Sequence, residues 1–135
     1  MKRTNEVSKL VGVSRRTLQY YDDEGVLVVE RSKNNHRMYD QKTLESIWEI
    51  MLYKEMGFEL KEIKELLTVS DTRKSECFKR RMEEIKNRIS KLKMQIEWIS
   101  LVQKNGMPPA PVENDGITYL DRIEELKRKT DRYGL

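Results

Sequence analysis

The segment that decides the fold is residues 13–27, which reads VSRRTLQYYDDEGVL. Ser14 is an N-cap candidate, because its side-chain oxygen can accept a hydrogen bond from a backbone amide in the first turn of a helix. Leu18 and Tyr21 lie three residues apart and therefore share one face of that helix. Gly25 is typical of the residue that ends a helix. The segment predicts a short amphipathic helix with a defined start and end.

A second short helix is predicted just before this segment. Thr4 is its N-cap candidate, and Val7, Leu10 and Val11 lie at helical spacing, which predicts a helix to about Leu10. Gly12 interrupts it. Two short helices joined by a turn that contains glycine form the helix-turn-helix pattern, whose second helix enters the major groove of DNA.

A small β-hairpin and two further helices are predicted next. The run 26–30, the polar turn 31–35 and the short run 36–39 indicate the hairpin. Asp40 is expected to cap a third helix, and a fourth, short helix follows Gly57. The third helix is expected to bury Leu44, Ile47, Trp48, Met51 and Leu52, and the fourth is marked by Leu60, Ile63, Leu66 and Leu67.

From residue 78 onward the apolar spacing is typical of a paired helix. Seven side chains step alternately by four and three residues, and we call them the seam: Phe78, Met82, Ile85, Ile89, Leu92, Ile96 and Ile99. This heptad spacing predicts packing against another helix, most simply the same helix of a second chain. A single helix folded onto its own domain is the alternative.

The long helix is expected to stop at residues 106–111, which hold all three prolines of the chain. Residues 117–127 then predict a short amphipathic helix through Ile117, Leu120, Ile123 and Leu126. A helix of this length is marginal alone, so we expect it to fold back beside Trp98 and Val102. The expected parts are a helix-turn-helix domain (1–70), a long helix (71–105) and a Pro-rich linker with a helical tail (106–135).

Composition argues against several classes of protein. Of 135 residues, 37% are hydrophobic, and no apolar run approaches the roughly 20 residues of a membrane span. Residues 1–6 lack the apolar core of a secretory signal, so we expect a soluble, cytoplasmic protein. Cys77 and His36 are the single cysteine and histidine, which leaves too few ligands for a Cys/His zinc site. With no nucleotide-binding motif either, we expect no enzyme, metal or cofactor.

Charge is distributed unevenly along the chain. Residues 1–69 carry 12 basic and 12 acidic side chains, whereas residues 70–135 carry 15 and 11. Residues 1–20 hold five basic side chains against one acidic, and residues 73–93 hold nine against three. Such basic stretches indicate a nucleic-acid partner. For residues 73–93, the solvated face of a long helix is the alternative.

These motifs together resemble the MerR family of bacterial transcription regulators. Residues 13–27 are similar to that family's GVS..TLRYY...GLL signature, and Arg37-Met38-Tyr39 resembles its wing motif. Residues 56–63, MGFELKEI, resemble its LGFSLEEIK segment. The resemblance covers residues 4–67 without large gaps, and three motifs in the right order make it specific.

The resemblance implies a mainly α fold: a winged helix-turn-helix domain with a β-hairpin wing, a coiled-coil dimerisation helix and a short C-terminal helix. It implies a homodimer whose long helices pair antiparallel on a pseudo-palindromic promoter site with a long spacer. It also implies regulation by bending and untwisting the DNA, so that RNA polymerase engages both promoter elements; such deformation depends on DNA stiffness. The seam agrees with pairing but leaves its direction open.

The residues expected to contact DNA lie on the second helix and the wing: Ser14, Arg15, Arg16, Thr17, Gln19, Tyr20, Tyr21, Arg31, Lys33 and Arg37. Arg15 or Arg16 would pair with guanine, Gln19 with adenine, and one of the adjacent tyrosines with phosphate. Contact with phosphate or solvent alone is the alternative for the two arginines. Two departures from the family pattern are Gln19, where arginine is usual, and Asn35-His36, where a glycine and an aromatic residue are usual.

Ligand control is a separate hypothesis. A small apolar effector would bind between the paired helices and the tail, against Met94, Trp98, Tyr119 and Leu120, although plain packing also explains such residues. The lone Cys77 is interpreted as inert, with a metal- or thiol-sensing role as the alternative. Two other functions compete: an architectural or excisionase-like module that only bends DNA, and a helical adaptor that has lost DNA binding.

Overall fold

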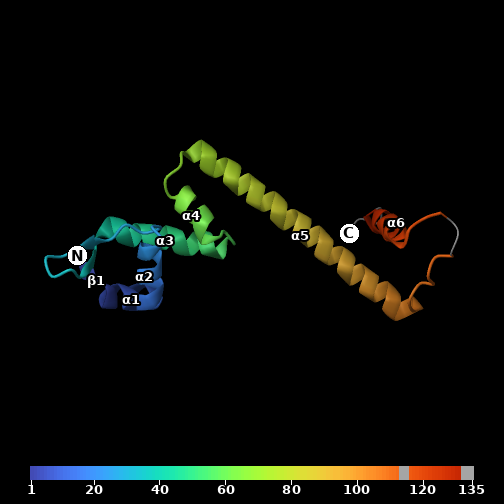
Figure 1. Cartoon of the computed structure of the whole chain (residues 1–135), viewed down its shortest axis with the longest axis horizontal. Coiled ribbons are helices and arrows are strands. Elements are labelled where there is room, and N and C mark those ends of the chain that lie inside the picture. Colours follow the sequence, from blue (N-terminus) through green and yellow to red (C-terminus); the bar gives the residue numbers. More distant parts are fainter. Residues whose placement is uncertain (113–115, 132–135) are drawn as a thin grey trace. The chain divides into compact units, whose positions relative to one another are not determined.

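The computed structural model describes residues 1–112 and 116–131. The elements, in chain order, are β1 (Lys2–Arg3), α1 (Thr4–Val11), α2 (Arg15–Asp23), β2 (Glu30–Arg31), β3 (Arg37–Tyr39), α3 (Gln41–Glu55), α4 (Leu60–Leu66), α5 (Asp71–Asn105) and α6 (Tyr119–Asp131) (Figure 1). The chain divides into two compact units, Met1–Cys77 and the part from Phe78 onward. The predicted fold class, mainly helical with a small wing, a long helix and a short last helix, is confirmed.

The helix-turn-helix is held by short-range hydrogen bonds. Gly12 ends α1 with a left-handed φ of 82°, and its amide donates to the Ser8 carbonyl at 2.9 Å. The Ser8 hydroxyl donates to the Val13 carbonyl at 2.6 Å, which fixes the turn. Ser14 then caps α2, as predicted, because its Oγ accepts a hydrogen bond from the Thr17 amide at 3.0 Å. The N-cap of α1, by contrast, is Arg3 and not the predicted Thr4, which is already helical.

The wing belongs to a three-stranded antiparallel sheet in the order β1-β3-β2. Lys2 pairs with Tyr39, and Arg31 pairs with Arg37. The predicted first strand, residues 26–30, is mostly wrong: only its last residue, Glu30, lies in β2. The amides of Val26 and Leu27 donate instead to the Tyr21 carbonyl, at 2.9 and 3.2 Å, and close the end of α2.

The wing turn, residues 32–36, is closed by its own backbone. The Ser32 amide donates to the His36 carbonyl and the Asn35 amide donates to the Ser32 carbonyl, each at 2.9 Å. Asn35 has a φ of 62°, a left-handed conformation that asparagine tolerates better than most residues. An asparagine at the position where the family usually has glycine therefore still permits a tight turn.

Helix α3 presents a different face to the core from the predicted one. Asp40 caps it as expected, and its carboxylate accepts from the Thr43 amide at 2.8 Å. Of the five residues predicted to be buried, only Ile47 is; Leu44 and Met51 are half-buried, whereas Trp48 is 63% and Leu52 is 39% exposed. The buried residues of α3 are Thr43, Ile47, Ile50 and Tyr53.

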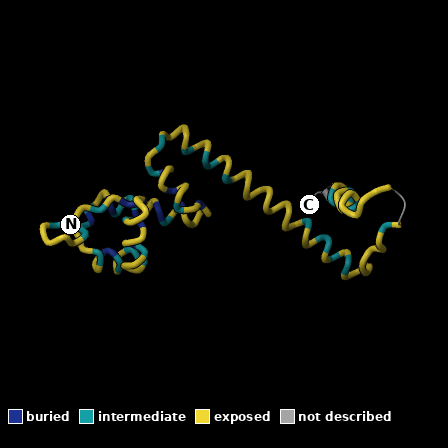
Figure 2. The backbone as a smooth tube through the Cα atoms, viewed as in Figure 1, coloured by how far each residue is buried: buried dark blue, intermediate teal, exposed yellow. Residues whose placement is uncertain are grey.

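The hydrophobic core lies in the first unit, where Figure 2 shows the buried positions gathered. Leu18 of α2, Tyr39 of β3 and Ile47 of α3 are completely buried, so this core holds the second helix and the wing on one scaffold. Tyr39 is thus a core residue. The other buried apolar residues are Val7, Tyr21, Val26, Leu27, Ile50, Tyr53, Phe58, Ile63 and Leu66.

Helix α5 begins in the last residues of the first unit and continues through the second; it has no buried residue and ends before Gly106 and the proline-rich segment. Helix α6 covers residues 119–131, slightly later than the predicted 117–127. It lies beside the end of α5, as predicted, since Trp98, Val102, Ile123 and Leu126 line one cavity. Among the described residues, no helix has a stretch long and apolar enough to cross a lipid bilayer.

Candidate nucleic-acid interface

Helix α2 has one face in the core and one face in solvent. Leu18 and Tyr21 anchor the buried face. Five residues from the N-cap to the second turn are exposed, namely Ser14, Arg15, Arg16, Gln19 and Tyr20, while Thr17 is half-buried and hydrogen-bonded to Ser14. Because the N-terminal residues of a recognition helix lie nearest the base edges, this face offers two guanidinium groups where bases are read.

The two adjacent tyrosines point in different directions. Tyr20 is 52% exposed, whereas Tyr21 is only 2% exposed. The Lys54 ammonium donates to the Tyr21 hydroxyl at 3.4 Å and lies 5.6 Å from the centre of its ring. Of the two tyrosines predicted as DNA contacts, Tyr21 is therefore buried in the core, and Tyr20 is the one that solvent can reach. The phosphate contact stays a prediction for Tyr20.

A hollow of about 420 Å³ lies beside Tyr20, between the end of α2 and the start of α4. Lys61 and Lys64 line it, together with Glu24 and Glu59. Both lysines are exposed, and neither was predicted from the sequence as a DNA contact. Their position within the MGFELKEI motif and the residue that follows it was the available signal, but only the fold shows that they lie beside Tyr20.

Gly25 lies close to Lys64, one of the residues that line this hollow. It has a φ of 72°, and a Cβ added there would lie 3.1 Å from the Lys64 ammonium nitrogen. A side chain at position 25 would therefore be strained by its backbone conformation and would displace Lys64.

The wing arginines are bound to α2. The Arg37 Nε donates to Asp22 Oδ2 at 2.8 Å, and its Nη2 lies 3.5 Å from Asp23 Oδ1. The hydrogen bond to Asp22 raises the pKa of Arg37. Arg31 Nη2 lies 3.8 Å from the same Asp22 oxygen, and its Nη1 donates to the Asn35 carbonyl at 3.2 Å.

The Arg37 side chain is thus only 18% exposed and engaged within the protein, and its contact with DNA stays a prediction. Arg31 is more exposed but shares the same carboxylate. The wing tip instead presents Lys33 together with Asn34, Asn35 and His36, all exposed. The exposed candidate contacts thus lie on α2, at the wing tip and at the start of α4.

The seam lies along α5 and is largely uncovered in a single chain. Phe78 is half-buried, and the other six side chains are 37% to 68% exposed: Met82, Ile85, Ile89, Leu92, Ile96 and Ile99. Such a continuous line of exposed apolar side chains is rare on a monomer and typical of an interface. The structure therefore leaves this face open for a second helix.

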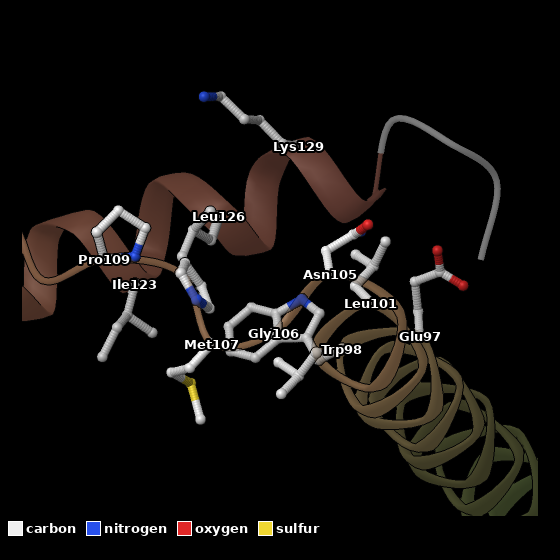
Figure 3. Close-up of a pocket in the computed structure, with 12 residues that line it drawn as sticks. Glu97, Trp98, Leu101, Asn105, Gly106, Met107, Pro109, Ile123, Leu126 and Lys129 are labelled. Carbon is white, nitrogen blue, oxygen red and sulfur yellow. The ribbon is translucent and has the colours of Figure 1, made fainter.

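A second surface of α5 lines an apolar cavity of about 700 Å³ with the proline segment and α6 (Figure 3). Of the four predicted effector residues, Trp98 lines it, whereas Met94, Tyr119 and Leu120 lie outside its lining. Trp98 lies about 200° around the helix from Ile96 and about 100° from Ile99, so it lies off the seam. The apolar lining comprises Trp98, Leu101, Val102, Met107, Pro108, Pro109, Ile123 and Leu126. In the described part of the chain, no three metal-binding side chains cluster.

Comparison with known proteins gives consistent matches. The family model described as "MerR HTH family regulatory protein" matches residues 2–69, and the one described as "MerR, DNA binding" matches residues 49–104. The HTH-type transcriptional activator TipA of Streptomyces coelicolor is 32% identical over 95% of this chain. The chain spans only about half of that relative's length, 55%.

Two solved structures are also similar. The N-terminus of MtaN, the Bacillus subtilis multidrug transporter activator, superposes with a TM-score of 0.70 at 27% identity and covers 76% of this chain and 98% of its own. HiNmlR, a MerR family regulator that lacks the sensor domain and was solved bound to promoter DNA, gives a TM-score of 0.54 at 26% identity. It covers 76% of this chain and 86% of its own.

Proposed function

Because this chain belongs to the MerR family of helix-turn-helix regulatory proteins, we propose that it regulates transcription by binding a pseudo-palindromic site in promoter DNA as a homodimer. The observation that carries this proposal is the exposed face of α2, which presents Arg15 and Arg16 beside the capping Ser14. Each arginine that pairs with a guanine discriminates against other bases by about 1–3 kcal/mol. HiNmlR, a structural relative, binds promoter DNA.

Non-specific affinity comes from the cations around this face. Arg15, Arg16, Lys33, Lys61 and Lys64 are exposed in each protomer. Each phosphate that a protein neutralises steepens the fall of log K with log salt by about 0.9, so these ten cations of a dimer would give a slope of roughly 9 if all of them bound phosphates. Because Arg15 and Arg16 are assigned to bases, only the six lysines of a dimer are left for phosphates, and we expect a slope of at least roughly 5.

Dimerisation is assigned to the seam on α5. Its exposed side chains repeat every three and four residues, which suits pairing with the same helix of a second chain. We propose that the two helices run antiparallel, so that the two recognition helices lie far apart on the DNA. A two-fold site with a long spacer would then be bent and untwisted to reach both, which lets RNA polymerase engage both promoter elements.

Selection of sites from a random-sequence duplex library tests this proposal. We expect two inverted half-sites at a fixed spacing, and faster electrophoretic migration when the site lies at the end of a fragment than at its centre, which reports a bend. Single half-sites without fixed spacing would contradict the dimeric mechanism. No enrichment at low salt would contradict sequence-specific binding.

The architectural or excisionase-like alternative makes a different prediction. Such a module bends DNA without regulating a promoter, so transcription from the selected site would not respond to the protein. In vitro transcription with RNA polymerase on a promoter that carries the site separates the two. A change in transcript level supports the regulator; a bend with no change supports the architectural module.

Effector control is a second candidate function, favoured by the cavity beside Trp98. Its volume of about 700 Å³ falls within the range of small-molecule sites, and its wall is formed mainly by apolar side chains. Figure 3 shows Glu97 and Lys129 pointing away from the Trp98 ring, which favours a neutral apolar ligand. A screen of apolar compounds tests this function, with the fluorescence of Trp98 measured in a Trp48→Phe background. If no compound both changes this fluorescence and alters the affinity for DNA, effector control through this cavity is contradicted.

A further inference from the structure

The acidic end of α2 breaks a rule of helix electrostatics. Asp22 and Asp23 occupy its last turn and Glu24 is the C-cap, and no basic residue lies in that turn. The C-terminus of a helix carries partial negative charge, so carboxylates are unfavourable there. They are also unfavourable close to phosphates, which this unit is proposed to bind. A local conflict of this kind often marks a functional residue.

The compensation for these charges comes from the wing. Arg37 of β3 donates its Nε to Asp22 at 2.8 Å, and Arg31 of β2 lies 3.8 Å from the same oxygen. Asp22 is 21% exposed, and Arg37 is 18% exposed. Hydrogen-bonded ion pairs that are this sheltered are stronger than surface pairs, because solvent screens them less.

The two arginines hold different parts of the hairpin. Arg37 is on β3, the strand that pairs with both β1 and β2, and it faces Arg31 across the hairpin where the strands meet the turn. Arg31 Nη1 also donates to the Asn35 carbonyl at 3.2 Å, in the turn itself. One carboxylate therefore ties both strands of the wing, and through Arg31 its tip, to the end of the recognition helix.

From this arrangement we propose that Asp22 is a positioning residue for DNA binding, which sets the distance between the recognition helix and the wing tip. Arg37 acts through Asp22 and is not itself a DNA contact. The wing contact is then made by the tip, around Lys33. This inference rests on the proposed function, because the positions that it fixes are the two DNA contacts of one protomer.

A double-mutant cycle tests the proposal on the duplex recovered by selection with the wild-type protein. We expect Asp22→Asn and Arg37→Gln each to weaken binding to that duplex about tenfold, and the double variant to be no weaker than the weaker single variant. Losses that multiply to roughly a hundredfold would show that Arg37 contacts DNA independently and would overturn the proposal. Binding by Asp22→Asn as tight as wild type would overturn it as well.

Two further variants serve as controls. Asp23→Asn removes the more distant carboxylate, which is 69% exposed and 3.5 Å from Arg37, and should cost less than Asp22→Asn. Asp22→Glu keeps the charge and should recover part of the affinity. If Asp22→Glu binds no better than Asp22→Asn while both melt at the wild-type temperature, the charge is not what positions the wing.

Hydroxyl-radical footprinting separates positioning from general destabilisation. We expect Asp22→Asn to lose protection where the wing lies and to keep it where α2 lies, whereas an unstable protein would lose both together. Equal loss at both positions, at an unchanged melting temperature, would overturn the proposal. If the wild-type protein itself selects no site, the proposed function fails; if it selects a site that Asp22→Asn protects identically, only this inference fails.

Discussion

Placing a charge in the middle of the seam should separate the two protomers. Ile89 lies at the centre of the seven seam positions and is 46% exposed in a single chain. Complete burial of an isoleucine side chain is worth about 1.5–3 kcal/mol, so burying the remaining half contributes about 0.7–1.4 kcal/mol. Because each dimer contains two copies, Ile89→Lys removes about 1.4–2.8 kcal/mol before any penalty for the new charges.

That penalty adds to the loss. Two ammonium groups would lie against apolar partners near each other, and a buried charge without a partner is costly. A total of about 3 kcal/mol or more corresponds to a dissociation constant at least a hundredfold higher. Sedimentation velocity over a range of protein concentrations should show mostly monomer for Ile89→Lys where the wild type is a dimer.

Ser90→Lys is the matched control for this change. Ser90 is adjacent, exposed and off the seam, so the same new charge should leave the dimer intact. Circular dichroism of both variants checks that α5 remains helical. A dissociation constant for Ile89→Lys within threefold of that for Ser90→Lys would refute the assignment of the seam as the dimer interface.

Three further predictions concern single residues. Ser14→Ala removes the cap of α2 and should lower the free energy of unfolding by about 1 kcal/mol in urea titrations, whereas Ser14→Asn should be nearly neutral; equal values would contradict the capping role. The hydrogen bonds from Thr43 lower the pKa of Asp40 in the folded protein below the unfolded value of 3.8. The Asp40 carboxylate therefore stabilises the fold fully at a pH above 3.8, and this contribution is lost as the pH falls through the lower pKa of the folded state. Below about pH 4, the melting temperature of the wild type should therefore fall more steeply than that of Asp40→Asn. Parallel curves of melting temperature against pH would contradict this role of Asp40. Trp98→Ala should make α6 more sensitive to protease, and an unchanged cleavage rate would show that α6 does not depend on Trp98.

The helix-turn-helix was predictable because its signals are local. Ser14, Gly12 and the spacing of Leu18 and Tyr21 each act within a few residues, and each has the predicted role in the structure. The wing was less predictable from the sequence. Strand β1 consists of Lys2 and Arg3, which carry no apolar pattern, and it exists only because it pairs with β3.

The buried face of α3 was mispredicted because apolar residues surround most of the helix. From position 43 to 53, several faces are apolar enough to be buried, so periodicity alone does not select one. The Asp40 cap and the contacts with β3 and α4 select the face of Ile47 and Ile50 and leave Trp48 in solvent. Packing between elements, and not helix propensity, decides this orientation.

The candidate site shows the same division between local and long-range information. Arg15 and Arg16 could be assigned from their place after the cap, and the structure exposes both. The ion pair of Arg37 could not be predicted, because its partner Asp22 lies 15 residues away in the chain. The lysines of α4 were missed for a similar reason: only the folded chain brings them beside Tyr20.

The central claim is that this chain reads a two-fold DNA site as a homodimer. DNase I footprinting on the selected site, with the wild-type protein and Ile89→Lys side by side, tests it most directly. We predict that the wild type protects both half-sites at the same protein concentration, weakens steeply with added salt, and loses this joint protection in Ile89→Lys. Protection of one half-site alone by the wild type, or an identical two-fold footprint from Ile89→Lys, would contradict the account.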